Sequence, residues 1–84
     1  MNVTFAALFA GERHGTKDDK DWCRVTLDDP LDPVDRMEVF VQDKTIIKYV
    51  GQLSPGSLVN CRARLYKNQK GFLNASLEDI SAGN

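Results

Sequence analysis

The sequence has few of the residues that catalytic and metal sites need. Its 84 residues include one histidine and two cysteines. No CxxC pair, P-loop, GxGxxG or nucleophile motif is present. These absences argue against a zinc site, a disulfide framework and a nucleotide-dependent enzyme. We therefore expect a protein that is not an enzyme and that uses no cofactor and no metal.

Long apolar runs are also missing. Residues 1–11 lack both a basic start and an extended apolar stretch, so we expect no signal peptide, no membrane span and a cytoplasmic location. The length suits one small domain, which we place at residues 1–80, with a flexible tail at residues 81–84. A chain this short buries only a little over ~60% of its unfolded surface. It must therefore protect its strand edges, either by closing a barrel or by pairing with a second copy.

An excess of positive charge is the third absence, since the formal net charge is −1. The charge is distributed unevenly, however. Residues 1–43 hold 5 Lys/Arg and 10 Asp/Glu, a net of −5, whereas residues 44–84 hold 6 and 2, a net of +4. The sequence is not that of a general polyanion binder, but its C-terminal half can form a basic surface.

What the sequence does contain is alternation with a period of two, which is typical of half-buried strands. We predict strands at residues 2–11, 22–27, 37–42, 57–67 and 72–80. The first is apolar on both faces, which suits a long, curved strand serving two sides of a barrel, with a helix as the competing interpretation. Residues 12–21 read as a loop or a ragged hairpin, residues 28–36 as an Asp- and Pro-rich loop, and residues 68–71 as a hairpin turn.

One short helix is predicted at residues 43–51. Asp43 can cap it, three apolar residues follow at helical spacing, and Gly51 can end it. The order is then β-β-β-α-β-β, an all-β, five-stranded barrel with one short helix between strands 3 and 4. This is the order of an OB-fold, and an SH3-like barrel is the alternative.

The alternation also predicts which side chains face inward. In the first strand, Val3, Phe5, Ala7 and Phe9 form one apolar face and Ala6, Leu8 and Ala10 form the other. In the other strands, the expected inner positions are Cys23, Val25, Leu27, Met37, Val39, Val41, Val59, Cys61, Ala63, Leu65, Leu73, Ala75 and Leu77. We interpret the two cysteines as buried, reduced thiols, although a disulfide is open if their strands are neighbours.

The candidate functional residues lie on the opposite faces of these strands. One core cannot explain two large aromatics facing outward from adjacent strands, and single-stranded nucleic acid binds through aromatic stacking and basic contacts. The outward set is Trp22, Arg24, Phe40, Arg62, Arg64 and Tyr66. Basic residues of the flanking loops extend it: Arg13, Lys17, Lys20, Lys67 and Lys70.

Other interpretations of the same residues stay open. Trp22 and Phe40 suit a homodimer interface or a partner-docking face, where aromatics and arginines are enriched, or a cap over one end of the barrel. Arg62 and Arg64 suit solvated pairing with acids such as Glu38. The second hypothesis is therefore a small protein-interaction barrel.

The chain resembles the small single-stranded DNA-binding proteins of phages and mobile elements. The resemblance lies in the polar first loop, in Lys20-Asp21-Trp22-Cys23, in Glu38-Val39-Phe40-Val41 and in Gly71-Phe72-Leu73. It implies an OB-fold, binding of single strands with little sequence preference, and dimerisation. It also implies stacking by Trp22 and Phe40 and backbone contacts by Arg13, Lys20, Arg24, Arg62 and Arg64. The net acidity and the Asp-rich loop depart from the family pattern and suit an accessory role in DNA replication or processing.

Overall fold

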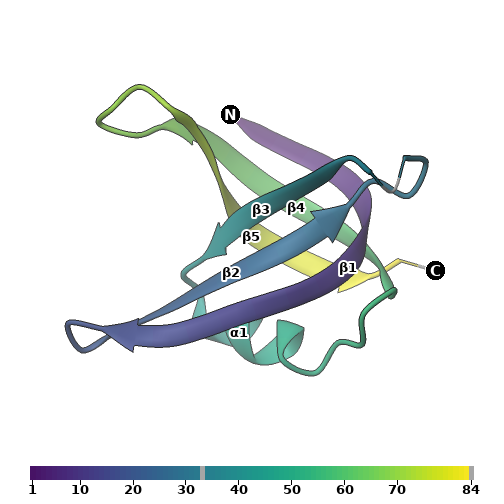
Figure 1. The fold of residues 1–84 in the computed structure, drawn as a ribbon, viewed down its shortest axis with the longest axis horizontal. Coiled ribbons are helices and arrows are strands. Elements are labelled where there is room, and N and C mark those ends of the chain that lie inside the picture. The colour runs from purple at the N-terminus through teal and green to yellow at the C-terminus, as the bar shows by residue number, and fades with distance from the viewer. Residues whose placement is uncertain (33, 84) are drawn as a thin grey trace.

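Five antiparallel or parallel pairings join the strands into a closed barrel in the order β1-β2-β3-β5-β4 (Figure 1). The computed structural model describes residues 1–32 and 34–83. The elements in chain order are β1 (Asn2–Lys17), β2 (Lys20–Asp28), β3 (Arg36–Val41), α1 (Lys44–Val50), β4 (Leu58–Lys67) and β5 (Leu73–Ala82). This is the OB-fold that the element order predicts, and not the SH3-like alternative.

The first strand is long and serves two sides of the barrel, as its apolar residues on both faces predict. Its first half pairs with β4, and its second half pairs with β2. The pairing with β2 shifts register between Phe9 and Gly11, which is where the strand bends from one neighbour to the other. The competing helix for this segment is wrong.

The polar segment at residues 12–21 forms a regular hairpin rather than a loop. Strand β1 continues to Lys17, and β2 begins at Lys20. The two turn residues, Asp18 and Asp19, have φ of 53° and 63°. A two-residue turn with both φ values positive matches the twist of the strands, and Asp tolerates that backbone better than most residues.

The core contains nearly all the inner positions expected from alternation. Two of those expectations are wrong: Met37 is partly exposed at the start of β3, and Leu73 is 66% exposed at the start of β5. Strand ends extend beyond the closed part of a small barrel, so an apolar side chain on the inner face can still be exposed there. A register shift between Arg62 and Ala63, opposite β5, changes the phase of β5 and turns Ile80 into the core.

The helix α1 forms where expected. The Asp43 side chain accepts a hydrogen bond from the Thr45 N–H at 2.8 Å, which caps the helix and contributes about 1 kcal/mol. Gly51 ends the helix by donating to the Ile47 carbonyl at 3.2 Å. Ile46 and Val50 are buried, so α1 covers one end of the barrel between β3 and β4 (Figure 1).

Strand β5 closes the barrel by pairing with β4 along its length and with β3 at a single position, Phe40 opposite Ser76. It continues through Ser81 and Ala82, which were expected in the flexible tail. The Gly83 N–H then donates to the Leu58 carbonyl at 2.9 Å. The expected tail also includes Asn84, and the expected loop at residues 28–36 includes Pro33; both lie outside the described residues.

Candidate nucleic-acid interface

An outward-facing hollow of about 360 Å³ brings five of the predicted site residues together. Its lining residues are Arg13, Lys17, Trp22, Arg24 and Phe40. They come from β1, β2 and β3, which are neighbours in the barrel. Trp22 is 40% exposed, so the indole is available to solvent although part of it is covered. Trp22 and Phe40 therefore belong to one surface and not to the core.

A row of register partners runs across the barrel from this hollow. In antiparallel and parallel pairs alike, partners at one register position face the same side of the sheet. The partners in order are Arg13, Arg24, Phe40, Ser76 and Arg64. Adjacent strands are ~4.8 Å apart, so four steps separate the outer arginines by less than ~20 Å along the curved surface. The aromatic hollow and the basic residue on β4 thus share one face, which we call the Phe40 row.

Each arginine of the Phe40 row contacts an acidic side chain. Glu38 lies 3.6 Å from Arg13 Nη2 through one carboxylate oxygen and 3.8 Å from Arg24 Nη1 through the other. Arg64 Nε donates to Glu78 Oε1 at 3.2 Å. The alternative interpretation of these arginines, solvated pairing with acids, is therefore correct for Arg64, but its partner is Glu78 and not Glu38.

Two of these arginines also lie over aromatic rings. The Arg24 guanidinium carbon lies 5.0 Å from the centroid of the Phe40 ring, and that of Arg64 lies 4.9 Å from the Tyr66 ring. Such contacts are favourable and fix the guanidinium plane near the ring. Both cations remain about half exposed, so they stay available to an anionic ligand.

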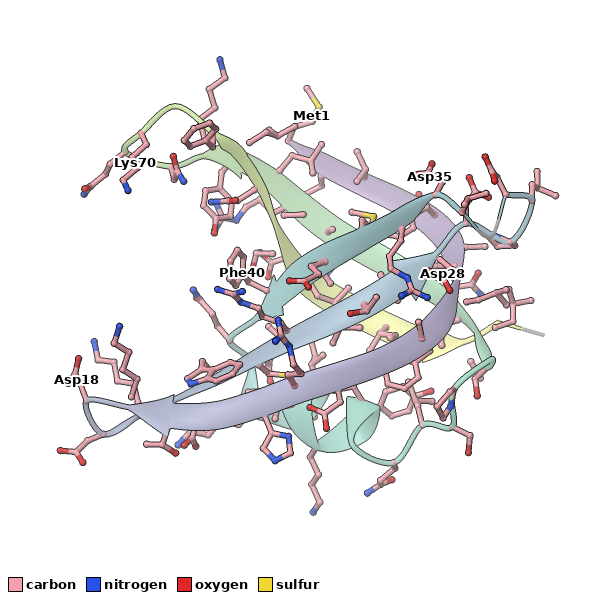
Figure 2. The ribbon with its side chains drawn as sticks, in the orientation of Figure 1. Met1, Asp18, Asp28, Asp35, Phe40 and Lys70 are labelled. Atoms are coloured by element: carbon pink, nitrogen blue, oxygen red, sulfur yellow. The ribbon has the colours of Figure 1, made fainter. Side chains whose placement is uncertain are left out.

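Two hairpins flank the Phe40 row. The β1–β2 hairpin ends at Asp18 and the β4–β5 turn contains Lys70, and both project from the same end of the molecule, with Phe40 between them in Figure 2. Lys67 ends β4 beside Tyr66, and Asn68 organises the turn by accepting from the Lys70 and Phe72 N–H groups. The predicted turn at residues 68–71 is confirmed, with Gly71 at a φ of 82°. In OB-folds the β1–β2 and β4–β5 loops border the binding face.

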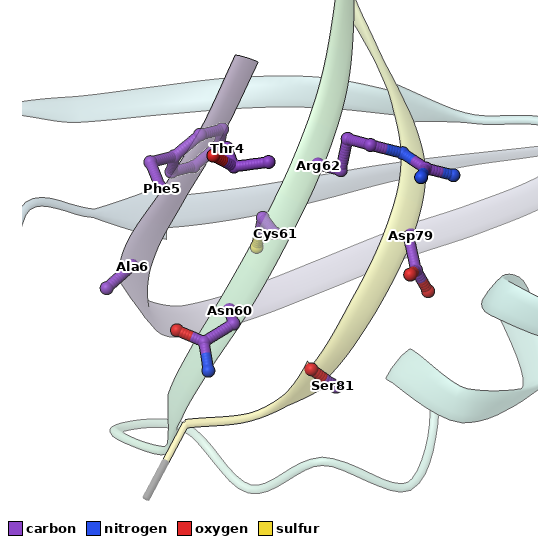
Figure 3. Close-up of a pocket in the computed structure, with 8 residues that line it drawn as sticks. All are labelled: Thr4, Phe5, Ala6, Asn60, Cys61, Arg62, Asp79 and Ser81. Carbon is purple, nitrogen blue, oxygen red and sulfur yellow. The ribbon is translucent and has the colours of Figure 1, made fainter. Parts of the chain in front are cut away.

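Arg62 lies apart from the Phe40 row. It lines a separate hollow of about 460 Å³ between β1, β4 and β5 (Figure 3). Its register partners are Thr4 and Asp79, so an acidic residue faces it across the sheet. Lys20 is also separate, since it lines a neighbouring hollow with Gln42 and Lys44. The structure therefore divides the predicted site residues into one group around Phe40 and two outlying cations.

Three residues of this face were not among the predicted site residues. Glu38, Ser76 and Glu78 occupy it together with the arginines. The alternation of β3 does place Glu38 beside Phe40 on the outer face, so the sequence carries that signal. Ser76 and Glu78 alternate with the inner residues Ala75 and Leu77, so the sequence also places them on the outer face of β5. What it does not show is that β5 lies beside β3, with Ser76 opposite Phe40 and only 5% exposed.

The Asp-rich loop lies at the other end of the molecule. Asp28 and Asp35 are on the side opposite Asp18 and Lys70 in Figure 2. Arg36 Nε and Nη2 donate to the two oxygens of Asp28 at 2.7 and 3.2 Å. This hydrogen bonding lowers the pKa of Asp28 below its ordinary value. The loop thus keeps its negative charge away from the Phe40 row.

The two cysteines are free, buried thiols, as expected from their strand positions. Burial raises the pKa of Cys61 to about 11. Burial, followed by the charge of Glu12 and a hydrogen bond from the Cys23 thiol to that carboxylate, raises the pKa of Cys23 to about 11. Neither is an activated thiolate.

Within residues 1–32 and 34–83, no group of three or more His, Cys, Asp or Glu side chains could hold a metal ion. The same residues form no helix that is long and apolar enough to cross a membrane.

Comparison with known proteins agrees with the fold. No family model matches the chain, and no curated protein matches it. Among solved structures, it is similar to a mitochondrial single-stranded DNA-binding protein of S. cerevisiae, with a TM-score of 0.80 and 11% identity over 98% of this chain and 94% of that one. It is also similar to a small single-stranded DNA-binding protein of Streptomyces coelicolor, with a TM-score of 0.60 and 12% identity over 99% and 94% of the two chains. At these identities the similarity establishes the fold.

Proposed function

We propose that this protein binds single-stranded DNA without catalysing a reaction, through the Phe40 row and the two hairpins beside it. The observation that carries the proposal is the hollow in which Trp22 and Phe40 lie among three cations. Bases stack on exposed aromatic rings, at ~1–3 kcal/mol each, and arginine and lysine contact the phosphates with release of counterions. The solved structures that are similar in fold are those of single-stranded DNA-binding proteins, which supports the same function here.

The proposed contacts follow from the position of each residue. Trp22 and Phe40 stack with bases, while Arg13, Lys17, Arg24 and Arg64 contact phosphates. Tyr66, Lys67 and Lys70 extend the surface along the β4–β5 hairpin. Arg62 and Lys20 are peripheral, because they line other hollows. A supporting role in DNA replication or processing, in a phage or plasmid and as a homodimer, is the wider setting that we propose.

A protein-interaction module is the competing proposal, and the composition of the face argues against it. Apart from Trp22, none of the large exposed apolar side chains of the described residues lines the hollow. They lie on loops or at strand ends: Met1, Leu31, Val34, Met37, Leu58, Phe72 and Leu73. Protein interfaces are depleted of lysine and acidic residues, whereas Lys17 lines this hollow and Glu38 contacts two of its arginines.

Fluorescence anisotropy of a labelled oligo-dT of about 15 nucleotides, a length within the range that OB-folds cover, tests the proposal. We expect binding at low salt that weakens steeply as salt rises, with single strands competing better than duplex of equal length. Absence of binding at low salt would reject the proposal. Association of the protein with itself through this face, insensitive to salt, would favour the interaction module.

A further inference from the structure

Two like charges face each other at the start of the Phe40 row. Arg13 on β1 and Arg24 on β2 are direct register partners on the same side of the sheet. Like charges in that relationship destabilise a strand pair. The carboxylate of Glu38 lies between them, with one oxygen toward each guanidinium. Its position relieves the repulsion between the two arginines.

The contacts of Glu38 are weak in geometry. Both distances, 3.6 and 3.8 Å, are those of ion pairs and exceed hydrogen-bond lengths. The side chain of Glu38 is 50% exposed, and those of Arg13 and Arg24 are 70% and 45% exposed. Exposed pairs of this kind are screened by water and salt, so they separate readily.

An ion pair elsewhere on the β2–β3 ladder differs from the contacts of Glu38. Arg36 donates two hydrogen bonds to Asp28, at 2.7 and 3.2 Å, from directly opposite positions on β3 and β2. That pair has the bidentate geometry of a structural contact. Glu38 instead touches two arginines loosely, as a mobile counterion would. The ion pair of Asp28 with Arg36 is therefore a fixed structural contact, whereas an incoming anion can replace Glu38 at its arginines.

From this contrast we infer that Glu38 is an internal competitor for the nucleic-acid phosphate. In the free protein its carboxylate neutralises Arg13 and Arg24; in the complex a phosphodiester takes its place between the two guanidiniums. A phosphate presents anionic oxygens to both arginines as the carboxylate does, and arginine binds phosphate in a planar, bidentate manner. Glu38 then sets the affinity for single strands lower than the exposed arginines alone would give. This inference rests on the proposed function.

Glu78 also contacts an arginine, at the far end of the row, but through a single hydrogen bond. It contacts Arg64 at 3.2 Å, with both side chains partly exposed. Every arginine of the Phe40 row therefore has an acidic neighbour in the free protein. The low net charge of the chain and a nucleic-acid face are compatible for this reason, because carboxylates hold the cations until a phosphate replaces them.

The test compares Glu38→Gln with Asp32→Asn by oligo-dT titration over a range of salt. Both variants remove one negative charge, and both keep a side-chain oxygen. Asp32 lies in the Asp-rich loop, where its side chain accepts a hydrogen bond from the Val34 N–H at 3.3 Å. We expect Glu38→Gln to bind about two- to fivefold more tightly, the factor that corresponds to an exposed ion pair. The slope of log K against log salt should change little, because the same phosphate lies between the two arginines in both complexes. Asp32→Asn should match the original protein.

Three outcomes separate the hypotheses. If the original protein binds but Glu38→Gln and Asp32→Asn are alike, the role of Glu38 is refuted and the proposed function stands. A weaker complex for Glu38→Gln would also refute it, because Glu38 would then contact the nucleic acid. If the original protein does not bind at low salt, the proposed function itself fails.

A double variant guards against an indirect effect of Glu38→Gln on folding. In the Arg24→Gln background, Glu38→Gln should increase the affinity for oligo-dT by a smaller factor. The reason is that the pair of Glu38 with Arg24 is already absent, so only its pair with Arg13 is removed. An equal gain in both backgrounds would contradict competition at Arg24. Circular dichroism of all variants confirms that the barrel is intact before affinities are compared.

Discussion

The indole of Trp22 packs directly against the backbone of Gly15, its register partner on β1. A Cβ atom placed on Gly15 would lie 2.9 Å from Cζ2 of the ring and 3.0 Å from Cε2. Contacts this short are not tolerated, so the absence of a side chain at position 15 is what lets the ring lie flat against the strand. One face of the indole is thereby covered, and stacking with a base is left to the other.

Gly15→Ala should displace the indole without unfolding the barrel. The backbone of Gly15 does not have a positive φ, so the added methyl acts only by contact with the ring. We expect a shift in Trp22 emission and weaker oligo-dT binding, by at most the ~1–3 kcal/mol of one stacking contact. Gly51→Ala is the matched control, since its Cβ would meet only ordinary contacts at 3.6 Å. If Gly15→Ala and Gly51→Ala had the same Trp22 emission and the same oligo-dT affinity, Gly15 would have no role in positioning the indole.

Trp22→Ala and Phe40→Ala should each weaken oligo-dT binding by about 1–3 kcal/mol while the protein stays folded. The reason is that both rings lie on the outer face, outside the buried core. Isothermal titration gives the affinity, and a urea unfolding curve gives the stability. A large loss of stability in Trp22→Ala, with affinity per folded molecule unchanged, would make Trp22 a structural residue instead.

Arg64→Gln and Arg62→Gln form a matched pair two positions apart on β4. Arg64 belongs to the Phe40 row, whereas Arg62 lines the hollow with Asp79. We expect Arg64→Gln to weaken binding and to reduce the salt slope by about 0.7, and Arg62→Gln to have the smaller effect. The salt dependence of oligo-dT affinity measures both. The reverse order would place the ligand over β1, β4 and β5.

The raised thiol pKa values predict a loss of stability at alkaline pH. The pKa of Cys23 and of Cys61 rises from an ordinary 9.0 to about 11, because burial disfavours the thiolate. As the pH rises, the unfolded chain therefore loses the thiol protons before the folded protein does. The stability that the buried thiols contribute is complete below about pH 9 and is lost between about pH 9 and 11. Urea unfolding at several pH values measures it. The double variant Cys23→Ala with Cys61→Ala should not lose this stability at alkaline pH. If the double variant and the original protein had the same pH profile, the cysteines would not be the cause.

Most of the fold could be predicted because most of the barrel strands alternate between inner and outer side chains. Cys23, Val25 and Leu27 on β2 are all buried, as their spacing predicts, and Asp43 caps the helix. The errors fall where a strand is irregular or ends. The register shift in β5 reverses the expected phase and buries Ile80, and Leu73 lies beyond the closed part of the barrel. A period of two cannot reveal a bulge.

The candidate site was predictable as a set of residues but not as a surface. Alternation assigned Trp22, Arg24 and Phe40 to outer faces. Only the strand order shows that Arg64 shares their row, because β5 enters between β3 and β4. The pairing of Glu38 with Arg13 depends on how far the β1–β2 hairpin extends, and the polarity of residues 12–21 concealed that length.

Titration of the protein with oligo-dT, followed by the emission of its single tryptophan, tests the central claim most directly, because Trp22 is the only such reporter in the chain. At low salt the emission should change in a saturable way as bases stack on the indole, and the same titration at higher salt should show a much weaker complex. Unchanged Trp22 emission at low salt, with no complex formed, would contradict the proposal that this face binds single-stranded DNA.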